Sequence, residues 1–285
     1  MKIGYFGFNN GPLCVPDSMR RILTTLEACG FESAWTGEHV VAIDPQAPPS
    51  PIPPEFPMLD TVAALSFAAG VTERIKLGSG IILLAQRNPV VLAGELSGID
   101  VLSKGRLLFG VGVGYVKGEF DAIGVPYEER GARTSEHIEV IRTLWTQEKP
   151  EFDGKFTSFK GIQSSPGPVQ SPHPPVIVGG MSPLAYRRAV RQGNGWYGFN
   201  QTVEAAGASI EGLRAAASDV DRPASLGELS ISVTPRGIVD ADAVKRFEDL
   251  GVGRLVLLPR PIGGGSPEDT TVRFIEETAQ ALGLS

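Results

Sequence analysis

Short apolar segments alternate with helical patterns along the whole chain, and this alternation is the feature that most constrains the fold. The expected strands are Ile3–Phe8, Ser33–Thr36, Ile75–Leu84, Leu107–Val113, Val176–Gly179, Gly195–Phe199, Leu229–Thr234 and Arg254–Leu258. Between them lie stretches whose apolar residues recur at intervals of three to four, which is the helical period. Several of the strands are nearly continuous apolar runs, which is typical of parallel strands buried on both faces.

Eight strand–helix units in 285 residues predict an α/β fold, a single (β/α)8 TIM barrel over residues 1–285 with long insertion loops. Such barrels take about 250 residues. The additional length falls in the proline-rich segment Ala42–Pro57 and in Lys149–Pro175, where a β-hairpin is expected around Asp153 and Gly154. The alternative is a doubly wound sheet, which needs fewer strands and a switch point.

Composition excludes several classes of function. The formal net charge is −6 and no basic cluster is present, so we expect no nucleic-acid partner. The two cysteines and three histidines lack metal-ligand spacing, so no metal site is expected. The N-terminal residues lack the apolar core of a signal peptide, and no apolar run is long enough to span a bilayer. We therefore expect a cytoplasmic protein without membrane contact.

In a barrel, chemistry is expected at the C-terminal ends of the strands. Gly179, Gly180, Met181 and Ser182 follow one strand and precede Pro183, which suits the first position of a helix. Glycines before a helix N-terminus can hold a phosphate through backbone N–H groups; the alternative is an ordinary turn with a good cap. Gly263–Pro267 repeats the pattern after the last strand, where a loop before a capped helix is the stronger interpretation.

Glycines at two further strand ends suggest a bound ring system. Gly112 and Gly114 lie next to Tyr115, and a strand with so few side chains allows a flat ring to approach closely, although barrel packing can require the same glycines. Ser79, Gly80 and Ile81 place a glycine inside an apolar strand, which indicates either a bulge or a backbone shaped to hold a ligand.

His39 is the candidate catalytic residue, because it follows Glu38 at a strand end and histidine exchanges protons near neutral pH. The alternative is a hydrogen-bonded loop histidine. His137 has polar neighbours in a helical pattern and is expected on the surface; His173 is assigned no role. No nucleophile elbow or phosphate-binding P-loop is present. The remaining possibility is chemistry supplied by a redox cofactor.

Five segments resemble the bacterial luciferase-like monooxygenase superfamily. They are IKLGSGIILLAQRNP at 75–89, IDVLSKGRLLFGVGVGY at 99–115, FDAIGVPYEERGAR at 120–133, VIVGGMSPLAYRRA at 176–189 and GVGRLVLLP at 251–259. Within the superfamily, the GVGVG strand and the ERGAR segment resemble the branch that uses the deazaflavin coenzyme F420.

The resemblance implies a (β/α)8 barrel, commonly a homodimer, with the cofactor ring in the barrel mouth. It implies a cis peptide bond at Gly80–Ile81 behind the ring, a cofactor phosphate on Gly179–Ser182, and a polar pair, Glu38 and His39, facing the ring. Deazaflavin sugar-phosphate dehydrogenases carry a tryptophan shortly after the histidine, which residues 40–44 lack, and a carboxylate where this chain has Tyr115. Oxidation of a sugar phosphate is therefore not expected.

These observations lead to the hypothesis of a coenzyme F420-dependent oxidoreductase that transfers a hydride to or from a small organic substrate. His39 would move a proton or polarise a carbonyl, and the Ala42–Pro57 loop would cover the pocket. The reaction direction is open; in the direction of substrate reduction, a separate dehydrogenase or reductase would supply reduced cofactor. Three alternatives remain: an FMN-dependent monooxygenase, a non-catalytic flavin-binding barrel, and an unrelated barrel enzyme acting on a sugar phosphate.

Overall fold

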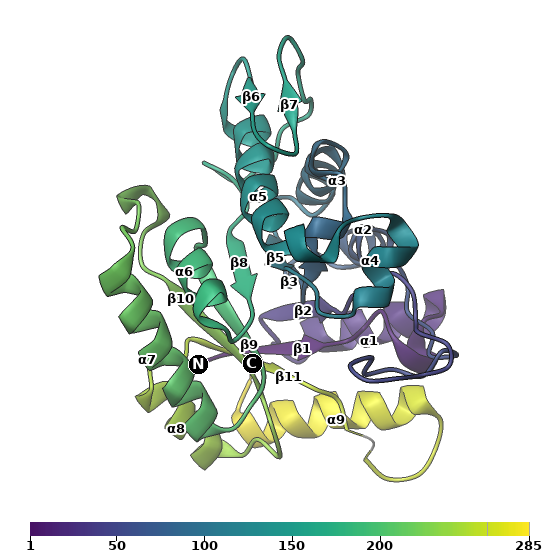
Figure 1. Ribbon diagram of the computed structural model, residues 1–285. Coiled ribbons are helices and arrows are strands. Elements are labelled where there is room, and N and C mark those ends of the chain that lie inside the picture. Colours follow the sequence, from purple (N-terminus) through teal and green to yellow (C-terminus); the bar gives the residue numbers. More distant parts are fainter. Residues whose placement is uncertain (261, 285) are drawn as a thin grey trace.

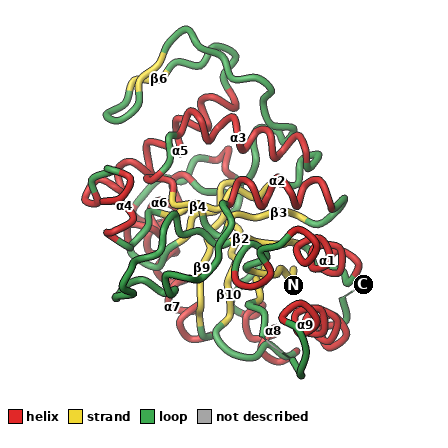
Figure 2. The backbone as a smooth tube through the Cα atoms, turned by 90° about the vertical axis from the view of Figure 1, so that its right-hand side faces the viewer, coloured by secondary structure: helices red, strands yellow, loops and turns green. Residues whose placement is uncertain are grey.

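A parallel β-barrel surrounded by helices forms the centre of the molecule (Figures 1 and 2). The computed structural model describes residues 1–260 and 262–284. The strands follow the order β3-β2-β1-β11-β10-β9-β8-β5-β4, and a further pairing of β3 with β5 closes the sheet on itself. The predicted (β/α)8 barrel is therefore confirmed.

The bounds of the elements agree closely with the sequence pattern. The strands are β1 (Lys2–Phe6), β2 (Ser33–Thr36), β3 (Lys76–Ser79), β4 (Ile82–Leu83), β5 (Leu107–Gly112), β6 (Phe152–Asp153), β7 (Ser158–Phe159), β8 (Val176–Gly179), β9 (Gly195–Gln201), β10 (Ser230–Pro235) and β11 (Arg254–Leu257). The helices are α1 (Pro16–Ala28), α2 (Thr61–Val71), α3 (Pro89–Leu102), α4 (Lys117–Ile123), α5 (Arg130–Thr146), α6 (Pro183–Gln192), α7 (Val203–Asp219), α8 (Ala241–Asp249) and α9 (Pro267–Leu282).

The expected strand over Ile75–Leu84 is interrupted. It divides into β3 and β4, and the bond between them, Gly80–Ile81, is cis, as the resemblance implied. Ser79 ties this break to the neighbouring strand, because its hydroxyl donates to the Gly110 carbonyl and accepts from the Gly110 N–H, both at 2.8 Å. A Cβ atom on Gly110 would lie 1.8 Å from the Ser79 carbonyl oxygen, so only glycine allows this approach of the two backbones.

Aromatic rings fill the inside of the barrel. Trp35 on β2 stacks on Tyr197 on β9 with ring centroids 5.5 Å apart, and these strands are not neighbours in the sheet, so the contact crosses the interior. Phe6 and Ile81 pack against this layer. A larger apolar cluster lies between the sheet and the helices. The barrel is thus a packed core rather than a pore, as expected for eight strands.

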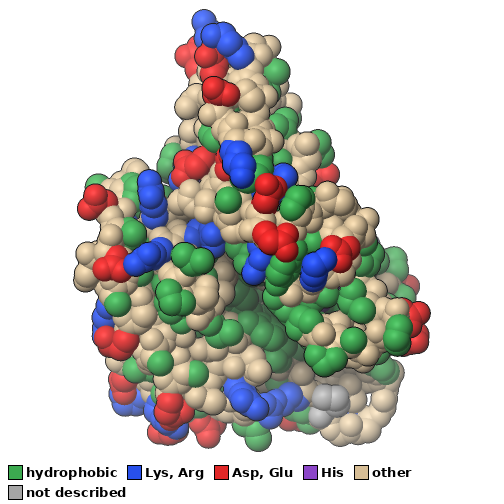
Figure 3. Space-filling view, viewed as in Figure 1, with side chains coloured by type: hydrophobic (Ala, Val, Ile, Leu, Met, Phe, Trp, Pro, Cys, Tyr) green, Lys and Arg blue, Asp and Glu red, His purple; other side chains and the backbone are tan. Residues whose placement is uncertain are grey.

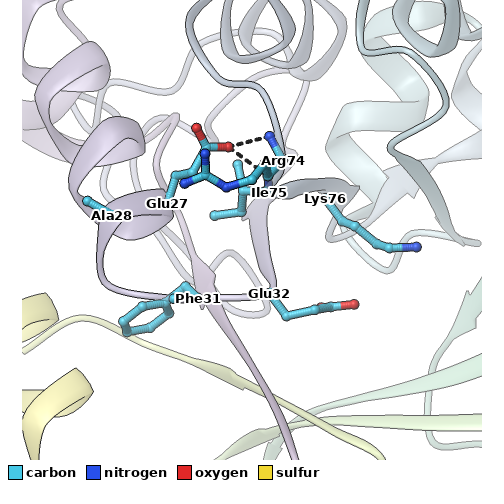
Figure 4. A pocket seen from close by; sticks show the side chains of 8 residues that line it. Glu27, Ala28, Phe31, Glu32, Arg74, Ile75 and Lys76 are labelled. Carbon is cyan, nitrogen blue, oxygen red and sulfur yellow. Dashed lines mark hydrogen bonds between the residues drawn. The ribbon is translucent and has the colours of Figure 1, made fainter. Parts of the chain in front are cut away.

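A polar depression marks the N-terminal end of β2 and β3 (Figure 4). The Glu27 carboxylate accepts hydrogen bonds from the backbone N–H groups of Glu73, Arg74 and Ile75. Partial burial pushes the pKa of Glu27 upward, but these donors outweigh it and the net shift is downward. Glu27 therefore anchors the turn before β3, and the depression has a structural explanation.

The hairpin β6–β7 projects from the barrel beside α5, as predicted (Figure 1). The Glu136 carboxylate on α5 accepts from the N–H groups of Lys155, Phe156 and Thr157 and so holds the hairpin turn. Within residues 1–260 and 262–284, no helix combines the length and apolar character needed to cross a membrane.

Candidate active site at the barrel mouth

A cavity of about 670 Å³ opens at the C-terminal ends of the strands. A hollow lined by hydrophobic side chains is visible near the centre of the face drawn in Figure 3. Predicted site residues that line the cavity are Glu38, His39, Gly80, Ile81, Gly112, Gly114, Tyr115, Gly179, Gly180 and Met181. Ser79 instead bonds Gly110, and Ser182 caps α6 by accepting from the Ala185 N–H. The structure thus brings together predicted residues from the ends of β2, β3, β5 and β8.

His39 is held by a buried carboxylate. Its Nδ1 atom lies 2.6 Å from Oε1 of Glu119, near the start of α4, and the Glu119 side chain is almost fully buried. The second oxygen of Glu119 accepts from Nε2 of Gln86 at 3.0 Å. Because an ionised carboxylate only accepts, this arrangement favours the His39 tautomer with its proton on Nδ1. The Nε2 atom of His39 is then the ring nitrogen left for a ligand.

Sequence reasoning missed both Glu119 and Gln86. Glu119 lies in the first turn of a short helix after the glycine-rich strand, which is an ordinary place for an acidic residue. The signal that could have found it is its place directly after a barrel strand end, where functional side chains gather.

The Glu38 carboxylate is directed to protein donors. It accepts from the Leu83 N–H at 2.9 Å and from two nitrogens of Arg87, at 3.2 and 2.8 Å. Arg87 also contacts Asp60, which caps α2. Burial alone would lower the pKa of Arg87, but the two carboxylates outweigh it and raise that pKa. Glu38 thus forms part of the cavity wall with its charge balanced by Arg87.

One side chain explains two of the predicted glycines. A Cβ atom on Gly112 would lie 2.1 Å from Cδ1 of Ile81, and one on Gly179 would lie 2.6 Å from the same atom. Gly114 has φ +78° and faces the Phe120 ring. Packing around Ile81 and Phe120 therefore requires these glycines, whether or not a ligand approaches them.

The proposed phosphate loop has a fixed backbone. Gly180 has φ +119°, a conformation that side chains disfavour, and its carbonyl accepts from Nε1 of Trp196 at 2.7 Å. Ser182 and Pro183 begin α6 as predicted. Three large side chains around the mouth are exposed, namely Tyr115 (50%), Met181 (52%) and Phe199 (41%). Exposed apolar side chains gathered at a cavity mouth are typical of a ligand-binding site.

Asn9 anchors the loop that carries His39. Its side chain accepts from the Gly37 N–H and donates to the carbonyls of Gly37 and Leu59, so it fixes both ends of the segment between them. Asn9 is fully buried, and sequence reasoning did not single it out. The segment contributes Pro51, Ile52, Phe56 and Met58 to the cavity.

The other histidines lie away from the cavity wall. His137 was expected on the surface, and this prediction is wrong. The His137 side chain is buried, and its Nδ1 atom lies 3.1 Å from the Leu84 carbonyl oxygen. Burial is also the main cause that lowers the pKa of His137.

Across the described part of the chain, His, Cys, Asp and Glu side chains nowhere form a group of three that could hold a metal ion.

Comparison with known proteins agrees with this architecture. The family model of the luciferase-like monooxygenases matches residues 2–254. An uncharacterised protein of Mycobacterium tuberculosis is 34% identical over 179 residues, covering 60% of this chain and 63% of the relative. The FMNH2-dependent dimethylsulfone monooxygenase of Pseudomonas putida is 34% identical over 60% of this chain and 46% of its own length. The aligned region thus spans less than two thirds of these relatives.

Solved structures share the fold over nearly the whole chain. An F420-dependent secondary alcohol dehydrogenase superposes with a TM-score of 0.78 at 16% identity, covering 99% of this chain and 98% of that one. The monooxygenase RslO1 from Streptomyces bottropensis gives 0.75 at 23% identity, with 99% and 98% covered. The barrel, its mouth and the family model together lead to one assignment: the chain belongs to the luciferase-like monooxygenase family.

Proposed function

We propose that this chain is an oxidoreductase that binds coenzyme F420 in the barrel mouth and transfers a hydride between it and a small organic substrate. The observation that carries the proposal is the His39–Glu119 pair at the wall of a mainly apolar cavity. Such a pair gives a histidine of fixed orientation in a mainly apolar site, which suits proton transfer beside a redox cofactor.

The residues present fit a planar cofactor with an anionic tail. Gly180 and Met181 line the cavity next to the N-terminus of α6, where backbone N–H groups favour an anion. Ile81, Gly112 and Tyr115 would contact the ring. When bound, the deazaflavin supplies a hydride donor or acceptor at its C5 atom.

The chain's own residues would handle the proton. Glu119 keeps the His39 ring in place through Nδ1, so that Nε2 can accept a proton from a substrate hydroxyl or donate one to a carbonyl oxygen. The loop between Gly37 and Leu59, fixed by Asn9, covers the side of the cavity and keeps bulk water out.

FMN-dependent monooxygenation is the second candidate, because the curated relatives include flavin-dependent oxygenases, among them the oxygenase component of a trigonelline monooxygenase from Acinetobacter baylyi. Monooxygenation with FMN, and reduction of a substrate by F420, would each require a separate enzyme that supplies reduced cofactor, whereas oxidation of a substrate would itself reduce F420. Titration with both cofactors, followed by spectroscopic turnover assays and oxygen uptake, separates the candidates. F420 binding with turnover supports the first function, and oxygen uptake with reduced FMN supports the second. Cofactor binding without turnover of any enone, imine, alcohol or aldehyde supports a non-catalytic role.

A homodimer through α2 and α3 belongs to the same proposal. Both helices are apolar around most of their circumference, a pattern typical of buried helices, and they pack side by side (Figure 2). Val91 and Leu102 on α3 are nevertheless exposed. Sedimentation of the Val91→Glu variant tests this: a dimer that becomes a monomer supports the interface, and a monomeric parent protein contradicts it.

A further inference from the structure

We infer that the substrate is a neutral, mainly apolar molecule with a single oxygen function, and that carboxylates and phosphates are excluded from the inner cavity. The inference rests on the proposed function only in taking this cavity as the substrate site. It concerns the part of the cavity away from the loop that would hold the cofactor's anionic tail.

The inner wall is mainly apolar. The side chains that form it come from β1, from the loop after β2, from the break between β3 and β4, from β4 itself and from β9. They are Phe6, Pro51, Ile52, Phe56, Met58, Ile81, Leu83 and Phe199. The Phe6 and Phe199 rings are 5.1 Å apart and form one continuous surface. Such a surface binds hydrocarbon and gives a polar group nothing to bond to.

Among the described residues, the lining of this space includes neither lysine nor arginine. The guanidinium group of the nearby Arg87 already forms ion pairs with the carboxylates of Glu38 and Asp60. An anionic substrate would therefore lose its hydration without gaining a lysine or arginine partner, and it would approach the buried carboxylates of Glu38 and Glu119.

The polar groups that remain suit one neutral oxygen. They are Nε2 of His39, the Tyr115 hydroxyl and the side-chain amides of Asn10 and Asn200, which line the same cavity. Gln201 is already engaged with Met181, Phe199 and Ser209. A hydroxyl can accept from and donate to such groups, and a carbonyl oxygen can accept from them; either costs far less to bury than an ion.

The test compares two probes of equal chain length, 2-octanone and octanoate, by saturation-transfer NMR at neutral pH. It is done first on the cofactor-free protein and then with F420 present. We expect 2-octanone to bind and octanoate to bind at least about tenfold more weakly, because burying an unpaired charge costs several kcal/mol. Equal or tighter binding of octanoate overturns the inference.

Adding a positive charge to the cavity wall tests whether this wall causes the preference for the neutral probe. Ile52→Arg adds a cation to the wall and should favour octanoate over 2-octanone; Phe56→Lys provides the same test if the first variant does not fold. Val169→Arg is the control, since Val169 is exposed and lies by Gly105, at the opposite end of β5. An unchanged preference in both wall variants contradicts the inference. Failure of F420 to bind, with probe selectivity intact, contradicts the proposed cofactor instead and leaves the inference standing.

Discussion

The Nδ1 atom of His39 lies 2.6 Å from Oε1 of Glu119, although 80 positions separate the two residues in the chain. His39 follows β2, and Glu119 lies in α4 after β5. Because β3 alone lies between β2 and β5 in the sheet, the barrel brings these two strand ends close together. The pair is therefore a product of the closed sheet and not of any local motif.

Replacing His39 tests its role in proton transfer. His39→Ala should lower turnover by at least about 100-fold, which is typical for loss of a general acid or base, while cofactor affinity stays unchanged. Steady-state kinetics and cofactor titration of the same preparation measure the two quantities. Unchanged turnover would remove His39 from the mechanism.

Glu119 is a positioning residue, because it acts through His39. Glu119→Gln should lower kcat and alter the pH dependence of turnover, because an amide has a donor that competes with Nδ1–H and no negative charge. The control is Glu129→Gln, which removes a carboxylate engaged in a helical i,i+4 pair with Arg133. A pH profile identical to that of the parent protein would show that Glu119 has only a structural role.

Arg87 compensates a buried carboxylate. Arg87→Met should reduce the free energy of unfolding by about 3 kcal/mol, because it leaves Glu38 buried without its partner. Denaturant unfolding measures this change. Lys117→Met is the matched control: it breaks an exposed pair with Asp121 and should leave stability unaltered. Equal effects of the two variants would contradict the role given to Arg87.

The ion pair of Glu32 and Arg254 should make stability depend on pH. Burial raises the pKa of Glu32, but the contacts with Arg254 outweigh it, so the net shift is downward. A carboxyl with a lowered folded-state pKa stabilises the protein above its unfolded pKa, about 4.3. This contribution is lost as pH falls through the folded value. Glu32→Gln should therefore be less stable than the parent protein at neutral pH, and the difference should shrink on acidification. Unfolding curves across this range that stay a constant distance apart would contradict the assignment.

The fit of Ile81 against Gly112 can be tested by a variant and its rescue. Gly112→Ala should destabilise the protein by about 1–3 kcal/mol, because the new Cβ would overlap Cδ1 of Ile81. Combining it with Ile81→Val, which removes that atom, should restore part of the loss. Gly167→Ala serves as control, since nothing lies within 4 Å of its Cβ position. Additive losses in the double variant would contradict the proposed contact.

Local sequence signals predicted the barrel well, and tertiary contacts explain what they missed. Ser33–Thr36 and Val176–Gly179 agree with the structure in full, because short apolar runs between turn residues define buried strands. His137 was misplaced, although it is spaced to share a helix face with the buried Thr134 and Ile141. The prediction of an exposed His137 was based on its polar neighbours in the sequence and not on this helical spacing.

The parts of the candidate site that lie at strand ends could be predicted from the sequence. The contacts between side chains that are distant in the chain could not. The loop Gly179–Ser182 and the position of His39 follow from strand ends alone. The partners of His39 and Glu38, namely Glu119 and Arg87, come from other strand–helix units. No local pattern relates them, because their pairing depends on how the barrel closes.

Calorimetric titration of the purified protein with coenzyme F420 and with FMN tests the central claim most directly. We expect saturable binding of F420 that is weaker in Gly180→Asp than in Gly180→Ala. Both variants strain the backbone at φ +119°, and only the first places a negative charge beside the cofactor's anionic tail. A flat titration with both cofactors, or equal affinities in the two variants, would contradict the account.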